Sequence, residues 1–244
     1  MTQTPKTAKN CLTEVVPDIW TVDGPCVQYS LGPLTIQCPT RMTIIRNKRA
    51  ELLVHSPIAP NHDMSNALAE LGTVSAILVP NSFHYLFLGP WLDRYPDSKL
   101  YVPHRLPKNI DMKNRLARSV AELADDWFEV VSIEEVDAGD WSEVSVLHNP
   151  SRTLILTDLM QNFQPSEYRN PIIRALLRIG GAARTYPTAS IEMRVPVFMR
   201  GRRKRVRKSF ETIKSWQPSR ILIAHGPQPR GDTAVLLEKA FAWV

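Results

Sequence analysis

Several residue types that define common catalytic sites are scarce in this chain of 244 residues. It has three cysteines, Cys11, Cys26 and Cys38, and no C-x-x-C pair. We therefore expect reduced thiols rather than a disulfide framework or a cysteine-rich zinc site. Only ten glycines are present, and none forms a phosphate-binding loop after a strand. The absence of a G-x-S-x-G elbow excludes the usual serine α/β-hydrolase arrangement.

The chain also lacks a long hydrophobic run. No apolar stretch approaches the ~20 residues that span a bilayer, and the N-terminal lysines are not followed by the hydrophobic segment of a secretory signal. We therefore expect a cytoplasmic protein. Its length and its 43% hydrophobic content fit one globular domain over residues 1–244, with a flexible start at 1–12. The oligomeric state stays open.

Short apolar runs alternate with amphipathic segments along most of the chain. Period and composition predict strands at residues 19–22, 42–46, 51–54, 74–79, 99–102, 127–133, 142–148, 153–159 and 220–226. Helices are predicted at 63–72, 90–96 and 110–124, from Pro171 to Gly180, before Pro218 and from about Asp232. This order predicts an α/β fold.

Four apolar runs lead to a side chain that can bind a metal. They read AILVPNSFH, VSVLH, TLILTD and RILIAH, and their last residues are His84, His148, Asp158 and His225. Layered α/β folds build their sites from side chains that follow strands. We therefore expect these four side chains to share one pocket.

Positive charge is concentrated at residues 200–208, which read RGRRKRVRK in a chain of net charge +6. Val206, Phe210 and Ile213 follow helical spacing. The segment is therefore interpreted as the exposed N-terminal part of an amphipathic helix. The alternative is a binding surface for nucleic acid or an anionic membrane. Its candidate residues are Arg202, Arg203, Lys204 and Arg205.

The ordered segments LGTVSAILVPNSFHYLFLGPWLDRYPDSKLYV, VLHNPSRTLILTDL and ILIAHG resemble the metallo-β-lactamase fold superfamily over residues 13–244. Within it, PN…H…LGPW, SRTLILTDL and AHG resemble the branch called domain of unknown function 4336. The resemblance implies an αββα four-layer sandwich of two mixed sheets with outer helices. It also implies that His148, Asp158 and His225 are metal ligands, with Asp158 in the place of the metal-bridging residue.

The loop around His84 departs from the pattern of this superfamily, whose metal loop reads T-H-x-H-x-D-H. Asn81 and Phe83 stand where its first two histidines belong. Tyr85 and Leu86 stand where the aspartate and histidine of the second metal belong, and His84 reaches a ligand place only if the loop shifts by one residue. A two-metal hydrolytic site needs ligands on both sides of its bridging hydroxide, so we do not expect one here.

The chemistry that remains is a mononuclear site for zinc, iron or manganese. Its predicted ligands are His84, His148, Asp158 and His225. Such a site would hydrolyse an ester, amide, thioester or phosphodiester of an unknown small molecule. Asp158 would orient the water, Tyr85 would donate to the oxyanion, and Asn81 would hold the loop or bind a carbonyl. The alternative is a non-catalytic member without metal that binds a ligand or an anionic partner through residues 200–208.

Overall fold

The computed structural model describes residues 11–31, 34–106, 110–183 and 186–244. Most of the predicted flexible start, 1–12, lies outside the described residues. The strands are β1 (Thr13–Val16), β2 (Ile19–Asp23), β3 (Val27–Leu31), β4 (Leu34–Cys38), β5 (Arg41–Arg46), β6 (Glu51–His55), β7 (Thr73–Leu78), β8 (Lys99–Val102), β9 (Ala117–Ser119), β10 (Val131–Asp137), β11 (Ser142–His148), β12 (Thr153–Leu156) and β13 (Arg220–Ile223). The helices are α1 (His62–Leu71), α2 (Leu88–Arg94), α3 (Val120–Asp126), α4 (Pro171–Gly180), α5 (Ile191–Met199), α6 (Arg203–Ser215) and α7 (Thr233–Phe241), with a 3-10 turn at Pro165–Glu167.

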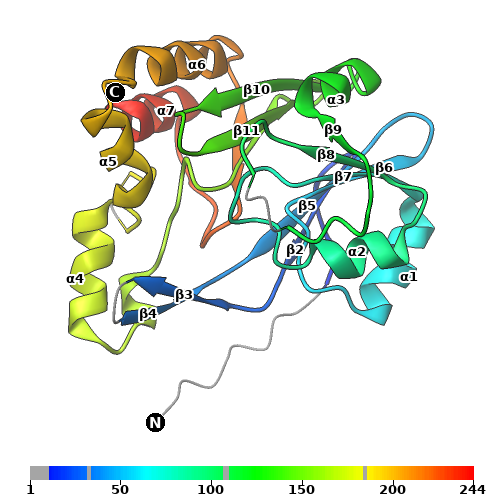
Figure 1. Cartoon of the computed structure of the whole chain (residues 1–244), viewed down its shortest axis with the longest axis horizontal. Coiled ribbons are helices and arrows are strands. Elements are labelled where there is room, and N and C mark those ends of the chain that lie inside the picture. The colour runs from blue at the N-terminus through cyan, green and yellow to red at the C-terminus, as the bar shows by residue number, and fades with distance from the viewer. Residues whose placement is uncertain (1–10, 32–33, 107–109, 184–185) are drawn as a thin grey trace.

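Two mixed sheets form the body of the molecule (Figure 1). The larger sheet has the order β1-β2-β5-β6-β7-β8-β9 and becomes parallel from β6 onward. The smaller sheet has the order β10-β11-β12-β13, in which only the last pair is parallel. Strands β3 and β4 form a separate hairpin that extends away from the sheets toward α4 (Figure 1). In the part of the chain described, no helix has the length and apolarity to cross a membrane.

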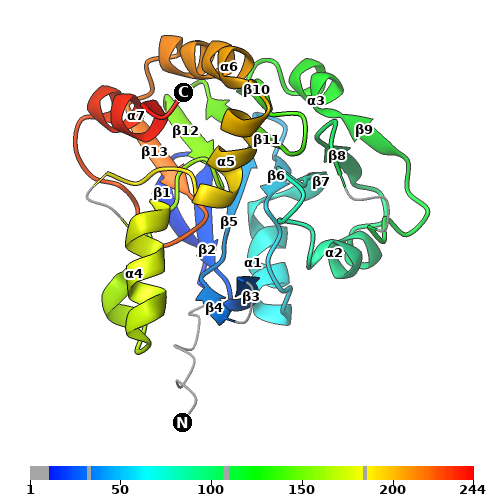
Figure 2. The ribbon, with the colours of Figure 1, turned by 60° about the vertical axis from the view of Figure 1, so that its left-hand side comes forward.

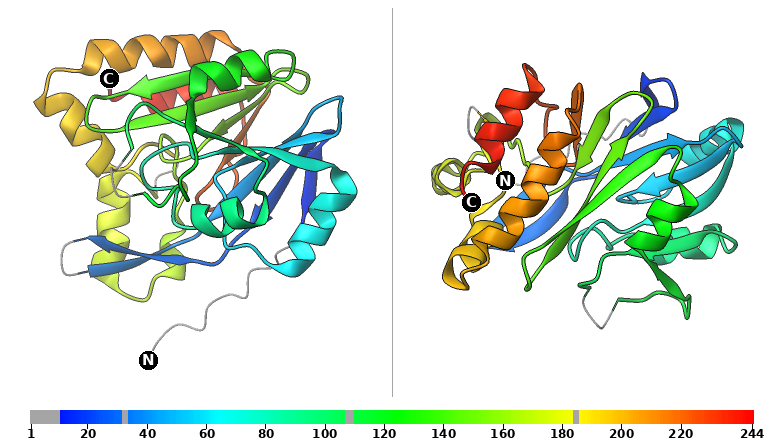
Figure 3. Two further views of the ribbon diagram at one scale, coloured as in Figure 1. Left: turned by 45° about the vertical axis from the view of Figure 1, so that its right-hand side comes forward. Right: turned by 90° about the horizontal axis from the view of Figure 1, so that it is seen from above.

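Alternating side chains on the central strands separate the molecule into layers. In β12, Leu154 belongs to the same buried cluster as Phe210 of α6, whereas its neighbour Ile155 belongs to the cluster that contains Leu78 of β7. On the other side of β7, Ile77 packs toward α1 and α2. Figures 2 and 3 show α6 and α7 outside the smaller sheet. The central strands are buried on both faces, which explains why they appear as continuous apolar runs in the sequence. The predicted αββα sandwich is confirmed.

The prediction of a helix over residues 110–124 is mostly wrong. Lys113 and Asn114 have the positive φ angles of 51° and 57°, which a right-handed helix does not allow. Helix α3 begins only at Val120, because the Ser119 side chain accepts a hydrogen bond from the Glu122 N–H and Glu122 bonds back to Ser119. Helix α5 and the β3–β4 hairpin were not predicted at all.

Candidate metal centre

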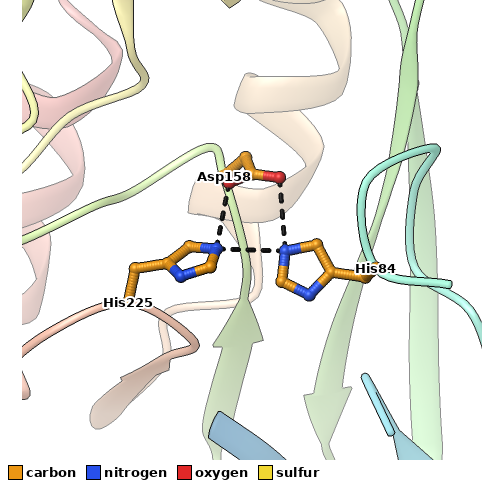
Figure 4. A group of neighbouring side chains, drawn as sticks. All are labelled: His84, Asp158 and His225. Atoms are coloured by element: carbon orange, nitrogen blue, oxygen red, sulfur yellow. Dashed lines mark hydrogen bonds and ion pairs between the residues drawn. The ribbon is translucent and has the colours of Figure 1, made fainter. Parts of the chain in front are cut away.

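Three of the four predicted side chains meet in one buried group (Figure 4). Asp158 and His225 follow β12 and β13, which are parallel neighbours, so both side chains emerge at the same sheet edge. Nε2 of His225 lies 3.1 Å from Nε2 of His84 and 3.1 Å from Oδ1 of Asp158. Nε2 of His84 lies 3.3 Å from Oδ2 of Asp158. Segments far apart in sequence thus bring two imidazoles and a carboxylate into contact.

The structure does not bring His148 to this group. His148 ends β11, which runs antiparallel to β12 and pairs His148 with Thr153 at the start of β12. Asp158 follows the opposite end of β12, roughly 16 Å further along at the rise of a β-strand. Nδ1 of His148 instead lies 2.7 Å from the Ser151 hydroxyl in the turn between the two strands. The predicted set of four ligands is therefore not assembled.

The second ring nitrogen of each clustered histidine has its own polar partner. Nδ1 of His225 lies 2.7 Å from the Pro39 carbonyl oxygen. A carbonyl only accepts, so Nδ1 carries a hydrogen, and Nε2 is the ring atom that faces Asp158. Nδ1 of His84 lies 2.6 Å from the Ser56 hydroxyl. Contacts of this kind orient imidazoles that bind metals. No local sequence pattern identifies Ser56 or Pro39 as a partner of these histidines.

Both carboxylate oxygens of Asp158 are held by side-chain amides. Oδ1 of Asn81 accepts from the Phe83 N–H at 2.8 Å, which turns the Asn81 Nδ2 toward Asp158. Nδ2 then donates to Oδ2 of Asp158 at 2.7 Å. Gln161 Nε2 donates to Oδ1 at 2.6 Å. Asn81 thus positions the aspartate rather than taking the ligand place that a histidine holds in the superfamily motif.

Glu143 anchors the segment that carries Asp158. Its side chain, which is fully buried in β11, accepts hydrogen bonds from the backbone N–H groups of Thr157, Asp158 and Leu159 at 2.9, 2.9 and 3.1 Å. These donors follow the last residue of β12, where the ladder no longer pairs them. Glu143 is not among the residues predicted from the sequence, and its one signal there is a carboxylate within the predicted strand 142–148.

Burial and mutual charge set the ionisation of the group. Burial acts to raise the pKa of Asp158, but His84 and His225 outweigh it and hold that pKa well below its usual range. Burial lowers the pKa of His84. Burial also acts to lower the pKa of His225, but Cys38 and Asp158 raise it well above normal. Burial and the charge of Asp158 raise the pKa of Glu143 to about 7. The cluster therefore keeps an ionised Asp158 that favours a nearby positive charge.

The donor set fits a small divalent cation. Ligand atoms at ~2.0–2.1 Å from a tetrahedral ion lie roughly 3.3 Å apart, close to the 3.1, 3.1 and 3.3 Å measured between the three side chains. Imidazole and carboxylate together suit zinc, iron or manganese. Among the residues that the structure describes, no other cluster of at least three histidine, cysteine, aspartate or glutamate side chains has this spacing.

The group lies at a cavity of about 390 Å³. The β3–β4 hairpin, the loop after β7, helix α4 and the start of α5 form its walls. Tyr85 lies in this wall, where its predicted donation to an oxyanion stays a prediction. The unpredicted hairpin and α5 are thus the elements that enclose the site.

A family model described as domain of unknown function (DUF4336) matches residues 17–173, more than half of the sequence. The chain belongs to this family. The match includes Asn81, His84 and Asp158 and ends before His225. No curated protein matches the sequence.

Solved metallo-β-lactamase structures share the whole architecture of this DUF4336 protein. VMB-1 aligns with a TM-score of 0.59 at 12% identity and covers 97% of each chain. DIM-1 metallo-β-lactamase exposed to ceftazidime aligns at 0.54 and 10% identity, with 96% of this chain and 95% of that one covered. A metallo-β-lactamase from Erythrobacter litoralis aligns at 0.52 and 10% identity, with 97% and 96% covered. The chain therefore has the metallo-β-lactamase fold.

The basic segment of this DUF4336 protein lies away from the cavity and is partly neutralised. Arg202 Nη1 donates to the Ala138 carbonyl oxygen at 2.5 Å, and Arg205 pairs with Asp137 at 2.6 Å. The Arg203 guanidinium lies over the Phe198 ring, and Lys204 is exposed. The helix predicted from Val206, Phe210 and Ile213 is confirmed, with these three side chains buried. The segment thus ties α6 to the β10–β11 turn.

We expect Arg202→Ala to lower the free energy of unfolding by about 1–2 kcal/mol, because a charged donor to a backbone carbonyl is lost. Lys204→Ala is the matched control and is expected to change it by less than about 0.5 kcal/mol. Urea unfolding followed by circular dichroism measures both. Equal losses for the two variants would contradict the structural role of Arg202.

Proposed function

We propose that this DUF4336 protein is a hydrolase dependent on one divalent metal ion, which His84, Asp158 and His225 hold. The observation that carries the proposal is the convergence of two Nε2 atoms and a carboxylate, all buried, within 3.1–3.3 Å of one another beside a cavity. The metallo-β-lactamase fold of the chain supports it. Zinc, iron and manganese remain the candidate ions.

When bound, such an ion supplies Lewis acidity and brings the pKa of a water molecule toward neutrality. Ser56 and Pro39 hold the Nδ1 atoms of His84 and His225, so each Nε2 lone pair stays directed into the site. Asn81 and Gln161 keep the Asp158 carboxylate from rotating. Asp158 would accept a hydrogen bond from a water molecule in the site and so orient it. Tyr85 is the proposed hydrogen-bond donor to the oxyanion that forms on a substrate carbonyl.

Only one ion is proposed because Tyr85 and Leu86 stand where the superfamily motif has the aspartate and histidine of the second metal. Leu86, which is 59% exposed, offers no ligand atom. The described part of the chain thus has no second set of ligands beside the first. A mononuclear site keeps open positions for water and substrate.

We expect untagged protein to hydrolyse p-nitrophenyl esters, to lose this activity with EDTA and to regain it with zinc or manganese. Asp158→Ala is expected to lower kcat/KM at least about a hundredfold, because the orienting and charge-balancing carboxylate is lost. Absorbance of released p-nitrophenolate measures the rates. Activity that survives both EDTA and Asp158→Ala would contradict the proposal. A well-folded, metal-loaded protein without activity on any ester, amide, thioester or phosphodiester would favour the non-catalytic alternative.

A further inference from the structure

The wall of the cavity is built from apolar side chains. The larger ones that are themselves buried include Ile36, Ile58, Trp141, Phe163, Leu177 and Met193. They come from the β3–β4 hairpin, the segments that flank the sheets, and helices α4 and α5. Such a wall contributes favourable binding free energy when an apolar ligand surface displaces water from it. The ligand that fits it carries a large apolar group.

Apart from the clustered histidines, the ionisable side chains in the described wall of the cavity include carboxylates but no basic residue. No lysine or arginine is present among the described residues that line it, whereas Asp158 and Glu192 are. Burial, followed by the negative charges of Glu192 and Asp158, raises the pKa of Tyr29 in the hairpin wall. Sites for phosphate or carboxylate groups supply Arg, Lys or helix N-termini to pair with them. The N-terminus of α5 reaches this cavity, but it carries Glu192 in its first turn. An anionic substrate would here meet carboxylates instead.

Building on the proposed hydrolase, we infer that its substrate is an uncharged carboxylic ester or thioester with a large apolar acyl or aryl group. At roughly 30 Å³ per non-hydrogen atom, the volume of a water molecule in the liquid, the cavity holds about a dozen atoms. In the reaction the water oxygen bonds to the acyl carbon and the C–O or C–S bond breaks. The proton passes to the leaving alcohol or thiol, and a carboxylic acid remains. Phosphodiesters are disfavoured because, beyond the metal-binding group, their anion finds no lysine or arginine among the described residues of the wall.

Ligand binding to EDTA-treated protein tests this inference without any turnover. In this assay the dye Nile red is bound to the protein and then titrated with one of two competitors. The competitors are 2-decanone, an uncharged ketone, and octyl phosphate, an anion of similar chain length. We expect the ketone to bind at least tenfold more tightly and to gain about fourfold for each added methylene until the cavity is full. Equal or tighter binding of octyl phosphate overturns the inference, and so does the absence of displacement by either compound.

A pair of variants on one helix locates the binding site. Ile179 and Ile172 are both exposed residues of α4, but only Ile179 lines the cavity. Ile179→Gln is expected to weaken 2-decanone binding five- to tenfold, and Ile172→Gln is expected to leave it unchanged. Equal effects of the two overturn the assignment to this cavity. If the ketone binds as expected but metal-loaded protein turns over no ester, the proposed function fails while the uncharged, apolar ligand class stands.

Discussion

His225→Ala is expected to weaken zinc binding at least a hundredfold. The substitution removes one of three donor atoms and leaves Asp158 with His84 as its one remaining imidazole neighbour in the cluster. Replacing a residue that only orients a metal ligand already lowers metal affinity ten- to a hundredfold. The loss of a ligand itself is therefore expected to lower the affinity by at least the upper end of that range. Competition with a chromophoric chelator measures the dissociation constant.

His148→Ala is the matched control for this experiment. His148 is also a buried histidine at a strand end, but it lies at the opposite end of β12 and contacts Ser151. Its replacement is expected to leave zinc affinity unchanged. Circular dichroism checks the fold of both variants, and His225→Gln replaces His225→Ala if the alanine variant does not fold. A loss of zinc affinity on replacement of His148 alone would show that the assigned ligand set is wrong.

Glu143→Ala is expected to lower the free energy of unfolding by at least about 3 kcal/mol. The substitution leaves three buried backbone N–H groups, those of Thr157, Asp158 and Leu159, without their acceptor. Each unsatisfied buried donor costs about 1–3 kcal/mol, and the buried cavity left by the side chain adds to this. Urea unfolding of the metal-free protein at neutral pH measures the change.

Glu134→Ala provides the comparison for Glu143. Glu134 lies on the adjacent strand β10 and is only partly buried. Its replacement is expected to change the free energy of unfolding by less than about 0.5 kcal/mol. A loss below about 1 kcal/mol for Glu143→Ala would contradict the anchoring of the Asp158 segment by this carboxylate.

The fold is predictable from the sequence because its signals are local and ordered. Buried strands such as β12 and β13 appear in the sequence as continuous apolar runs, and the order of these runs along the chain resembles one superfamily. The runs also point to Asp158 and His225, because parallel neighbours deliver their last side chains to one edge. His148 was assigned wrongly because the end of the sheet at which a strand stops depends on its direction, which pairing alone determines.

The supporting contacts of the site are not predictable from local pattern. Ser56 and His84 follow neighbouring strands of the larger sheet, and Glu143 and the Asp158 segment belong to neighbouring strands of the smaller sheet, so each pair meets only once these strands have paired. Asn81 was noted in the sequence, but its donation to Asp158 needs the tertiary fold. The apolar wall was missed as well, because the β3–β4 hairpin and α5 that form part of it were not predicted.

Metal analysis of protein purified without a polyhistidine tag tests the central claim most directly. The arrangement of His84, Asp158 and His225 predicts close to one zinc, iron or manganese ion per chain, which EDTA removes and which returns on addition of the ion. Less than about a tenth of an ion per chain, with no uptake of any of these three metals, would contradict it.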